Sequence, residues 1–153
     1  MSQILTLSLM RLLSFSKYFV FVTSFLTMTA SAQKCDYEAM LNNNMPKLEG
    51  YKFIKSFPVE TDKQAETAEY NYLLNHDTKY RLVIVDNGNE GERMLVTIRG
   101  RDKKVLATNK DRQKKTFSTV VDFVCPATGI YFFEVSFQDG RRDCGLNILA
   151  FQK

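Results

Sequence analysis

His76 is the only histidine of the chain, and it lies in residues 75–78, a polar stretch that we predict as a loop. A cysteine thiolate beside a histidine base is one route to nucleophilic catalysis, so a Cys–His dyad is one interpretation. No third group that would orient the imidazole is recognisable, which favours a polar loop residue. After residue 32 the serines are Ser56, Ser118 and Ser136, and none lies in a Gly-x-Ser-x-Gly motif. A serine hydrolase of that type is therefore disfavoured.

Residues 86–90 read Asp-Asn-Gly-Asn-Glu and hold several oxygen donors around a glycine. A calcium loop needs regularly spaced ligands and a terminal bidentate glutamate, and this segment has neither. One histidine and three dispersed cysteines give no zinc spacing, and the sequence contains no phosphate-binding glycine loop. We therefore predict a hairpin turn at residues 86–90, and we expect no metal or cofactor.

Glu134 is the one acidic residue within the strongly apolar segment 130–137. It alternates with Ile130, Phe132 and Ser136 on a face that becomes polar toward its end. A catalytic carboxylic acid needs an apolar setting of this kind, so a small secreted carboxylate-dependent hydrolase is one alternative. A solvent-facing residue on a half-exposed strand gives the same pattern, and we favour that interpretation.

Basic residues gather in the segment 99–115, which contains only two acidic residues. They fall in two consecutive connections that we expect to share one end of the fold. The functional interpretation is a docking patch for an anionic polymer or an acidic protein, and the alternative is a pair of solvated loops that keep strand edges soluble. The basic residues of this segment are Arg99, Arg101, Lys103, Lys104, Lys110, Arg112, Lys114 and Lys115.

The first 32 residues have the three parts of a secretory signal peptide: basic residues, a short apolar run, and a small-x-small exit at Ala30 and Ala32. The run is too short to span a bilayer comfortably. Lipidation is disfavoured because Lys34, rather than a small residue, precedes Cys35. We predict cleavage before Gln33, one domain over residues 33–153, and a periplasmic or extracellular location. Export and a mature charge of +2, from 19 basic and 17 acidic residues, make nucleic acid an unexpected partner.

The sequence pattern of residues 33–153 predicts an all-β fold that follows one short helix at residues 36–41. Residues 42–44 and Pro46 should end that helix. Apolar residues then alternate with polar ones in eight segments separated by turn residues, and Pro58 should stop the first of them. This pattern favours an antiparallel β-sandwich or barrel with about eight strands. The expected strands are residues 51–57, 68–74, 80–85, 94–98, 105–107, 117–123, 130–137 and 145–151.

Cys35, Cys125 and Cys144 leave room for one disulfide and one spare thiol. Cys125 ends the sixth predicted strand and Cys144 begins the eighth, and these strands should point the same way. A strand length of about 25 Å then separates the two cysteines, whereas a disulfide joins Cα atoms only about 4.4–6.8 Å apart. Cys35 should therefore be a partner in any bridge.

Two segments carry a resemblance to a known family. Residues 94–109 form an apolar alternation, an Asp-containing turn and the ending Leu106-Ala107-Thr108-Asn109, and residues 128–135 contain a Gly-x-Tyr strand. From residue 94 onward the chain resembles the bacterial pre-peptidase C-terminal domain, a jelly-roll sandwich appended to secreted proteases and other exported proteins. The resemblance implies an antiparallel β-sandwich that is jelly-roll-like, and it implies binding, targeting or assistance in secretion rather than catalysis. It carries over no site residue. In a jelly roll the first strand begins near the end of the sixth, so we predict a Cys35–Cys125 bridge with Cys144 free.

The sequence therefore predicts an exported, non-catalytic binding module for an envelope polysaccharide or an envelope protein. The alternatives are the hydrolase built on Glu134 and a structural envelope subunit that assembles through its sheet edges. An aromatic- or carboxylate-lined groove would favour sugar binding, and an exposed apolar patch would favour a protein partner. The oligomeric state and the identity of the ligand stay open at this point.

Overall fold

The computed structural model describes residues 35–61, 67–87, 93–111, 113–114, 116–138 and 143–153. The signal peptide predicted at residues 1–32 and most of the turn predicted at residues 86–90 lie outside the described residues. Arg112 and Lys115 of the basic segment lie outside them as well.

The described chain begins with a short helical region. Helix α2 spans Tyr37–Asn44, and the 3-10 helix η2 follows at Met45–Leu48. Asp36 caps α2 by accepting a hydrogen bond from the Ala39 backbone N–H at 2.9 Å. The predicted helix is confirmed, but the asparagines do not end it. Asn44 completes the last turn, where its side-chain amide donates to the Met40 carbonyl at 2.8 Å.

Eight strands follow, as the alternation predicts. Strand β6 begins three residues later than expected, and Phe117 instead forms an isolated bridge with Lys110. The strands are β1 (Lys52–Thr61), β2 (Thr67–Leu74), β3 (Lys79–Asp86), β4 (Met94–Arg99), β5 (Val105–Thr108), β6 (Val120–Val124), β7 (Gly129–Phe137) and β8 (Asp143–Gln152).

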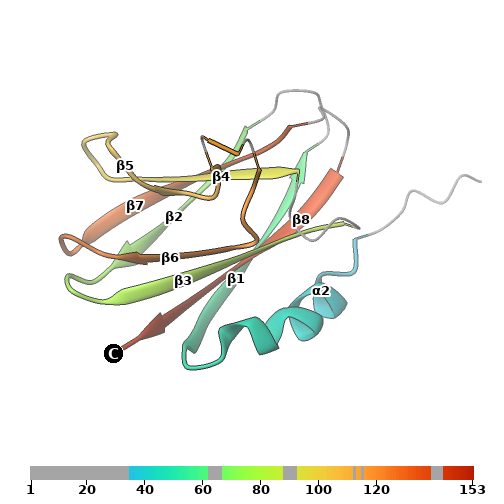
Figure 1. Ribbon diagram of the computed structural model, residues 1–153, viewed down its shortest axis with the longest axis horizontal. Helices are drawn as coiled ribbons and strands as arrows, with labels where there is room; N and C mark the ends of the chain where they lie inside the picture. The colour runs from blue at the N-terminus through green and yellow to red at the C-terminus, as the bar shows by residue number, and fades with distance from the viewer. Residues whose placement is uncertain (1–34, 62–66, 88–92, 112, 115, 139–142) are drawn as a thin grey trace, which may run out of the picture. The chain divides into compact units, whose positions relative to one another are not determined.

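The strands form two antiparallel four-stranded sheets, in the orders β1-β8-β3-β6 and β2-β7-β4-β5. The first strand pairs with the last, the second with the seventh, the third with the sixth and the fourth with the fifth. This nesting is the topology of a jelly roll, so the predicted fold class is confirmed. In Figure 1 the two sheets stack as layers, and α2 lies against the outer side of the sheet that contains β1, β3 and β8.

Two apolar clusters hold these layers together. The main core lies between the sheets and takes one face of each strand, including Leu82 and Ile84 of β3 and Phe133 of β7, all fully buried. Val83 and Val85 point to the other face of β3, where they pack with residues of α2. The two-sided burial of β3 explains why its sequence is apolar at almost every position.

Pro58 does not stop β1. The strand continues to Thr61, and Pro58 pairs in register with Leu146 of β8. A proline is tolerated here because β1 is an edge strand, and one side of its backbone pairs with none of the described strands. The predicted strand end is therefore wrong.

The disulfide joins Cys35 to Cys144, and Cys125 is a buried free thiol. The predicted Cys35–Cys125 pairing is thus wrong, although Cys35 is one partner as expected. Cys125 lies beside Thr78, at the end of the sheet where Lys79 pairs with Gln152. Cys144 lies at the opposite end, next to the pair of Gly145 with Asp86.

The helical region explains the difference. Eight α-helical residues and four 3-10 residues rise about 20 Å, close to the length of an eight-residue strand. The region therefore extends along the sheet instead of returning to its starting end, and it reaches the start of β1 through the hydrogen bond from the Tyr51 N–H to the Leu48 carbonyl. Cys35 consequently lies at the far end, beside Cys144.

Candidate functional site

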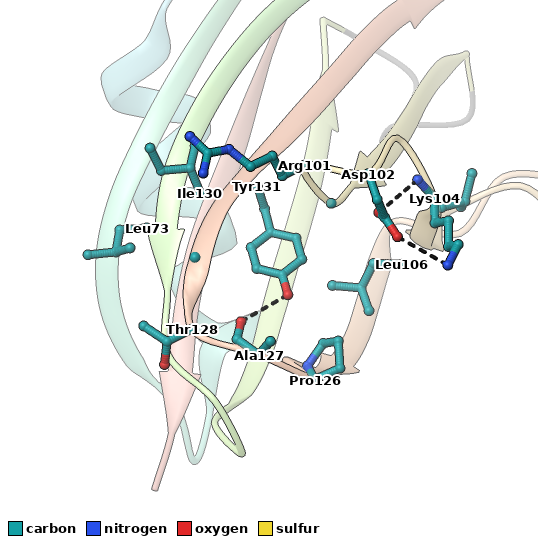
Figure 2. A pocket seen from close by; sticks show the side chains of 13 residues that line it. Leu73, Arg101, Asp102, Lys104, Leu106, Pro126, Ala127, Thr128, Ile130 and Tyr131 are labelled. Atoms are coloured by element: carbon teal, nitrogen blue, oxygen red, sulfur yellow. Dashed lines mark hydrogen bonds and ion pairs between the residues drawn. The ribbon is translucent and has the colours of Figure 1, made fainter.

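A groove of about 610 Å³ opens at one end of the sheet formed by β2, β7, β4 and β5. The β4–β5 turn forms one wall, and the β6–β7 turn with the start of β7 forms the other. The end of β2 completes it (Figure 2). Its lining residues are Leu73, Gly100, Arg101, Asp102, Lys104, Val105, Leu106, Pro126, Ala127, Thr128, Gly129, Ile130 and Tyr131.

Aliphatic side chains make the groove apolar while they remain in contact with solvent. Leu73 is 57% exposed, Ile130 48% and Val105 46%. Leu73 and Ile130 are direct cross-strand neighbours on the outer face of β2 and β7. Arg101 and Lys104 add two positive charges to the same groove. The site therefore combines exposed aliphatic surface with cationic groups.

Tyr131 fixes the wall contributed by the β6–β7 turn. Its side chain is buried, and its hydroxyl donates to the Ala127 carbonyl at 2.9 Å (Figure 2). The Cys125 thiol donates to the same carbonyl at 3.1 Å. Burial, followed by the interaction with Cys125, raises the pKa of Tyr131 to about 12. The phenol thus stays neutral and holds the turn in one conformation.

Backbone hydrogen bonds hold the β4–β5 turn. The Lys103 N–H donates to the Gly100 carbonyl and the Gly100 N–H to the Lys104 carbonyl, both at 3.0 Å. Lys103 adopts a φ of 62°, a left-handed conformation that a lysine rarely takes. Asp102 accepts from the Lys104 N–H at 3.1 Å, and this bond is the main cause that lowers the pKa of its carboxyl group. The turn is therefore organised before any partner arrives.

The basic segment does not form one patch. Register places the 100–104 connection at one end of β5, next to the Arg99–Val105 pair, and the 109–119 connection at the other end, after the Thr97–Thr108 pair. Consecutive connections of antiparallel strands must lie at opposite ends, so the expectation of a shared end is wrong. Of the six basic residues that the structure describes in this segment, Arg101 and Lys104 line the groove and the other four do not.

The other described basic residues of the segment lie outside the groove and have different environments. Arg99 forms an ion pair with Glu134 at 2.7 Å, and it also donates to the Lys103 carbonyl at 3.2 Å. Lys110 lies over the Phe117 ring, 5.8 Å from its centroid. Lys103 and Lys114 are exposed. Arg99 therefore binds Glu134 and the backbone of the β4–β5 turn, and its charge is not free for a partner.

Glu134 lies on the outer face of β7, directly opposite Glu69 of β2 and Thr97 of β4. Its side chain is one-third exposed, its carboxylate is bound to Arg99, and it does not line the groove. The favoured interpretation, a half-exposed strand residue, matches this position.

His76 lies in the turn between β2 and β3, and its side chain is 59% exposed. Its backbone N–H donates to the Thr128 hydroxyl at 2.9 Å, and its imidazole lies 3.4 Å from the carboxylate of Asp77. The adjacent Asp77 N–H reaches the Cys125 carbonyl, but the Cys125 thiol is buried and bonded to Ala127. Within the described ranges, no group of three His, Cys, Asp or Glu side chains lies close enough to hold a metal ion.

Sequence reasoning missed the aliphatic part of the groove. Leu73 and Ile130 each occupy a position of their strand that faces outward, where the alternation calls for a polar residue. Two apolar residues at solvent-facing positions of their strands were the one feature of the sequence that could have indicated an exposed apolar surface. Val105 lies on β5, at the opposite edge of the sheet from β2, and its place in the same groove depends on strand pairing that no local pattern in the chain contains.

The fold and the groove together make the chain a small jelly-roll sandwich that has a mixed apolar and cationic surface at one end. The chain is similar in fold to PliG of Aeromonas hydrophila, a periplasmic inhibitor of g-type lysozyme, with a TM-score of 0.51 and 12% identity over 68% of this chain and 90% of that one. No protein-family model matches the sequence, and no curated protein matches it either. No helix in the described part of the chain is long and apolar enough to cross a membrane.

Proposed function

We propose that the chain is an exported, non-catalytic module that binds a protein and blocks its activity. The observation that carries this proposal is the groove with three exposed aliphatic side chains, Leu73, Val105 and Ile130, beside Arg101 and Lys104. Protein interfaces centre on apolar side chains and are enriched in arginine, with polar groups at the rim. An exposed aliphatic cluster of this kind marks a site for a macromolecular partner.

A protein is a better-supported partner than a polysaccharide. The one aromatic residue of the groove, Tyr131, is buried, so it offers no exposed ring for a sugar to stack on. The one carboxylate there, Asp102, lies 3.3 Å from the Lys104 ammonium and accepts the Lys104 N–H. The groove therefore offers no exposed aromatic ring, and its single carboxylate is already paired with Lys104.

The arrangement of the ionisable groups also supports a non-catalytic role. Glu134 is paired with Arg99 outside the groove, and His76 and the Cys125 thiol face different partners. A general acid or base must lie within hydrogen-bond reach of the reacting atoms, and the groove holds no such free group among its lining residues. The hydrolase alternative finds no comparable support.

The preferred partner is a glycosidase that cleaves the bacterial cell wall. Such enzymes carry a pair of carboxylic residues in an open cleft, and the β4–β5 turn presents the cationic side chains of Arg101, Lys103 and Lys104. Charge complementarity of this kind guides association and specificity. The fold similarity to a periplasmic inhibitor of g-type lysozyme supports the same class of partner.

An extracytoplasmic location agrees with this role. The Cys35–Cys144 bond is of the kind that persists in oxidising compartments such as the periplasm. The predicted signal peptide points the same way. The resemblance to pre-peptidase C-terminal domains stays a prediction, and it also implies binding rather than catalysis.

The direct test is hydrolysis of a cell-wall suspension by purified g-type lysozyme with increasing amounts of the protein. We expect concentration-dependent inhibition that weakens at least about tenfold in the variant Ile130→Asp, because it places a charge in the apolar centre of the interface. Lys104→Glu should weaken inhibition and reduce its salt sensitivity. Lys114→Glu is the matched control in the other connection and should inhibit like the wild type. Undiminished hydrolysis with excess wild-type protein would contradict the inhibitor proposal.

A further inference from the structure

The four sheet edges of the sandwich differ sharply in how well they are protected from pairing. The edge strands are β1 and β6 in one sheet and β2 and β5 in the other. Exposed edges invite pairing with another chain, and proteins guard them with prolines, bulges, charges or short length. Strands β5 and β6 have only four and five residues. Strand β1 carries Pro58, Lys52 and Lys55, with a break in register between Phe53 and Lys55.

Strand β2 has no proline, no bulge and no short length to protect it, and it carries only one charge. It runs for eight residues and pairs with β7 in unbroken register, from Thr67 opposite Ser136 to Leu74 opposite Gly129. It contains no proline, lysine or arginine, and Glu69 is its single charge. Among the described residues, its other side pairs with no strand. A long, regular and nearly uncharged edge of this kind is a site for strand addition.

We propose that β2 pairs antiparallel with β2 of a second copy of the chain, about a two-fold axis that passes through Tyr70. A continuous sheet requires that the outward residues of one copy meet outward residues of the other. With Tyr70 on the axis, the outward residue Glu69 of each copy faces Asn71 of the other, and Thr67 faces Leu73. An amide is a good hydrogen-bond donor to a carboxylate, so the pairing forms two equivalent Glu–Asn contacts.

The neighbouring registers lack this complementarity. An axis through Glu69 would oppose the two carboxylates directly, and an axis through Asn71 would place Glu69 against Leu73. Glu69 and Asn71 are both exposed in the described chain, so they are available to a partner. A two-fold pairing also uses the same edge on both copies and therefore closes as a dimer rather than growing into a fibre. Self-complementarity of the edge is the reason that the occupant is a second copy.

The test is sedimentation velocity of the purified, disulfide-bonded protein over a range of micromolar concentrations. The wild type should show a reversible monomer–dimer equilibrium. Asn71→Glu should weaken the dimer about tenfold, because two pairs of like charges then face each other across the axis. Adding Glu69→Lys to that variant should restore the dimer, since each new lysine faces a glutamate. Asn43→Glu is the matched control on the exposed surface of α2 and should behave like the wild type.

Each result decides the proposal. A loss in Asn71→Glu together with recovery in the double variant supports both the edge and the register. A wild-type protein that stays monomeric at every concentration overturns the proposal and leaves β2 open to a strand from another protein. A dimer that Asn71→Glu does not weaken, or that the double variant does not restore, overturns it as well. Circular dichroism of each variant verifies that the fold is retained.

Discussion

Cys35 and Cys144, 109 residues apart in the sequence, are joined by a disulfide with their Cα atoms 6.3 Å apart. Cys35 lies just before helix α2, and Cys144 lies at the start of β8 in the centre of its sheet. The bond therefore attaches the N-terminal helix to the strand that pairs with both β1 and β3. The disulfide thus fastens α2 to the same sheet face against which its apolar residues pack, on β3 and β8.

We predict that Cys35→Ser lowers the free energy of unfolding by about 2–5 kcal/mol, because the bond closes a long loop in the unfolded chain. Urea unfolding followed by circular dichroism measures the effect. Reductant should destabilise the wild type to the same degree and leave the variant unchanged, which serves as the control. Equal unfolding midpoints for the oxidised wild type and the variant would contradict the pairing.

The third cysteine gives an independent check of the same connectivity. Cys125 is fully buried and bonded to the Ala127 carbonyl, so its thiol should react with a thiol reagent only after unfolding. Peptide mapping without reduction should return one linked pair containing Cys35 and Cys144. A linked peptide that contains Cys125 would show that the helical region does not extend along the sheet as described.

Arg81 and Asp122 form a two-point ion pair across β3 and β6, with contacts of 2.7 and 2.8 Å. Hydrogen bonding to Arg81 is the main cause that lowers the pKa of Asp122 below its usual range. A carboxyl group with a lowered folded pKa stabilises the fold above its unfolded pKa of about 3.9, and this contribution is lost as the pH falls through the folded value. The pair should therefore contribute stability near neutral pH and little in strong acid.

We predict that Asp122→Asn costs about 1 kcal/mol of unfolding free energy near neutral pH, a modest value because both side chains are partly exposed. The difference from the wild type should shrink toward zero in strong acid, as measured by urea unfolding across pH. Asp77→Asn is the control, since the Asp77 side chain is 79% exposed and its substitution should have no measurable effect on stability. A deficit that persists unchanged in acid would refute the electrostatic explanation.

Two tyrosines of the main core should respond in opposite ways to removal of their hydroxyl groups. The Tyr70 hydroxyl and the side-chain amide of Asn147 are buried without a hydrogen bond in the described structure. Burial raises the pKa of Tyr70 far above its usual value, an effect that nearby Asn147 offsets only in part. Tyr80, in contrast, accepts a hydrogen bond from the Asn75 N–H at 2.9 Å.

Tyr70→Phe should therefore leave stability unchanged or raise it by up to about 1 kcal/mol, because it removes an unsatisfied buried hydroxyl. Tyr80→Phe should lower stability by about 1 kcal/mol, because it leaves the Asn75 N–H without its acceptor. Thermal unfolding of both variants compares them directly. A larger loss for Tyr70→Phe than for Tyr80→Phe would mean that Tyr70 has a partner, such as a buried water that bridges it to Asn147.

Export predicts a defined N-terminus. Ala30 and Ala32 satisfy the small-residue positions of a signal-peptidase site, so the secreted protein should begin at Gln33. N-terminal sequencing of the protein from the periplasmic fraction or the medium checks this. A sequence that begins at Met1, or a lipid on Cys35, would overturn the predicted processing.

The strands could be predicted because period-two alternation is a local signal. In β2, β3 and β4, successive side chains lie on opposite faces of the sheet as the alternation predicts. Tyr70, Leu82 and Val96 accordingly pack in the main core between the sheets. The predicted end of β1 at Pro58 was wrong because a proline need not end a strand at the edge of a sheet. Whether a strand lies at an edge depends on the whole topology. The number of strands and the turn signals predicted only a sandwich or barrel, and the jelly-roll order was expected from the resemblance to a jelly-roll family.

The candidate site was much less accessible to prediction. Its members come from β2, the β4–β5 turn, β5, the β6–β7 turn and β7, and only strand pairing across the sheet places Leu73, Val105 and Ile130 in one groove. Charge counting found Arg101 and Lys104 but grouped them with residues at the other end of β5. It also could not show that Arg99 is bound to Glu134, a residue 35 positions away.

Hydrogen exchange on the protein with and without saturating g-type lysozyme tests the central claim most directly, because it locates the binding surface without any substitution. We predict slower amide exchange in residues 100–106 and 126–131 when the lysozyme is present, and unchanged exchange in α2 and the 109–119 connection. Protection that is confined to α2 or the 109–119 connection, or that is absent altogether, would contradict the assignment of the groove as the protein-binding site.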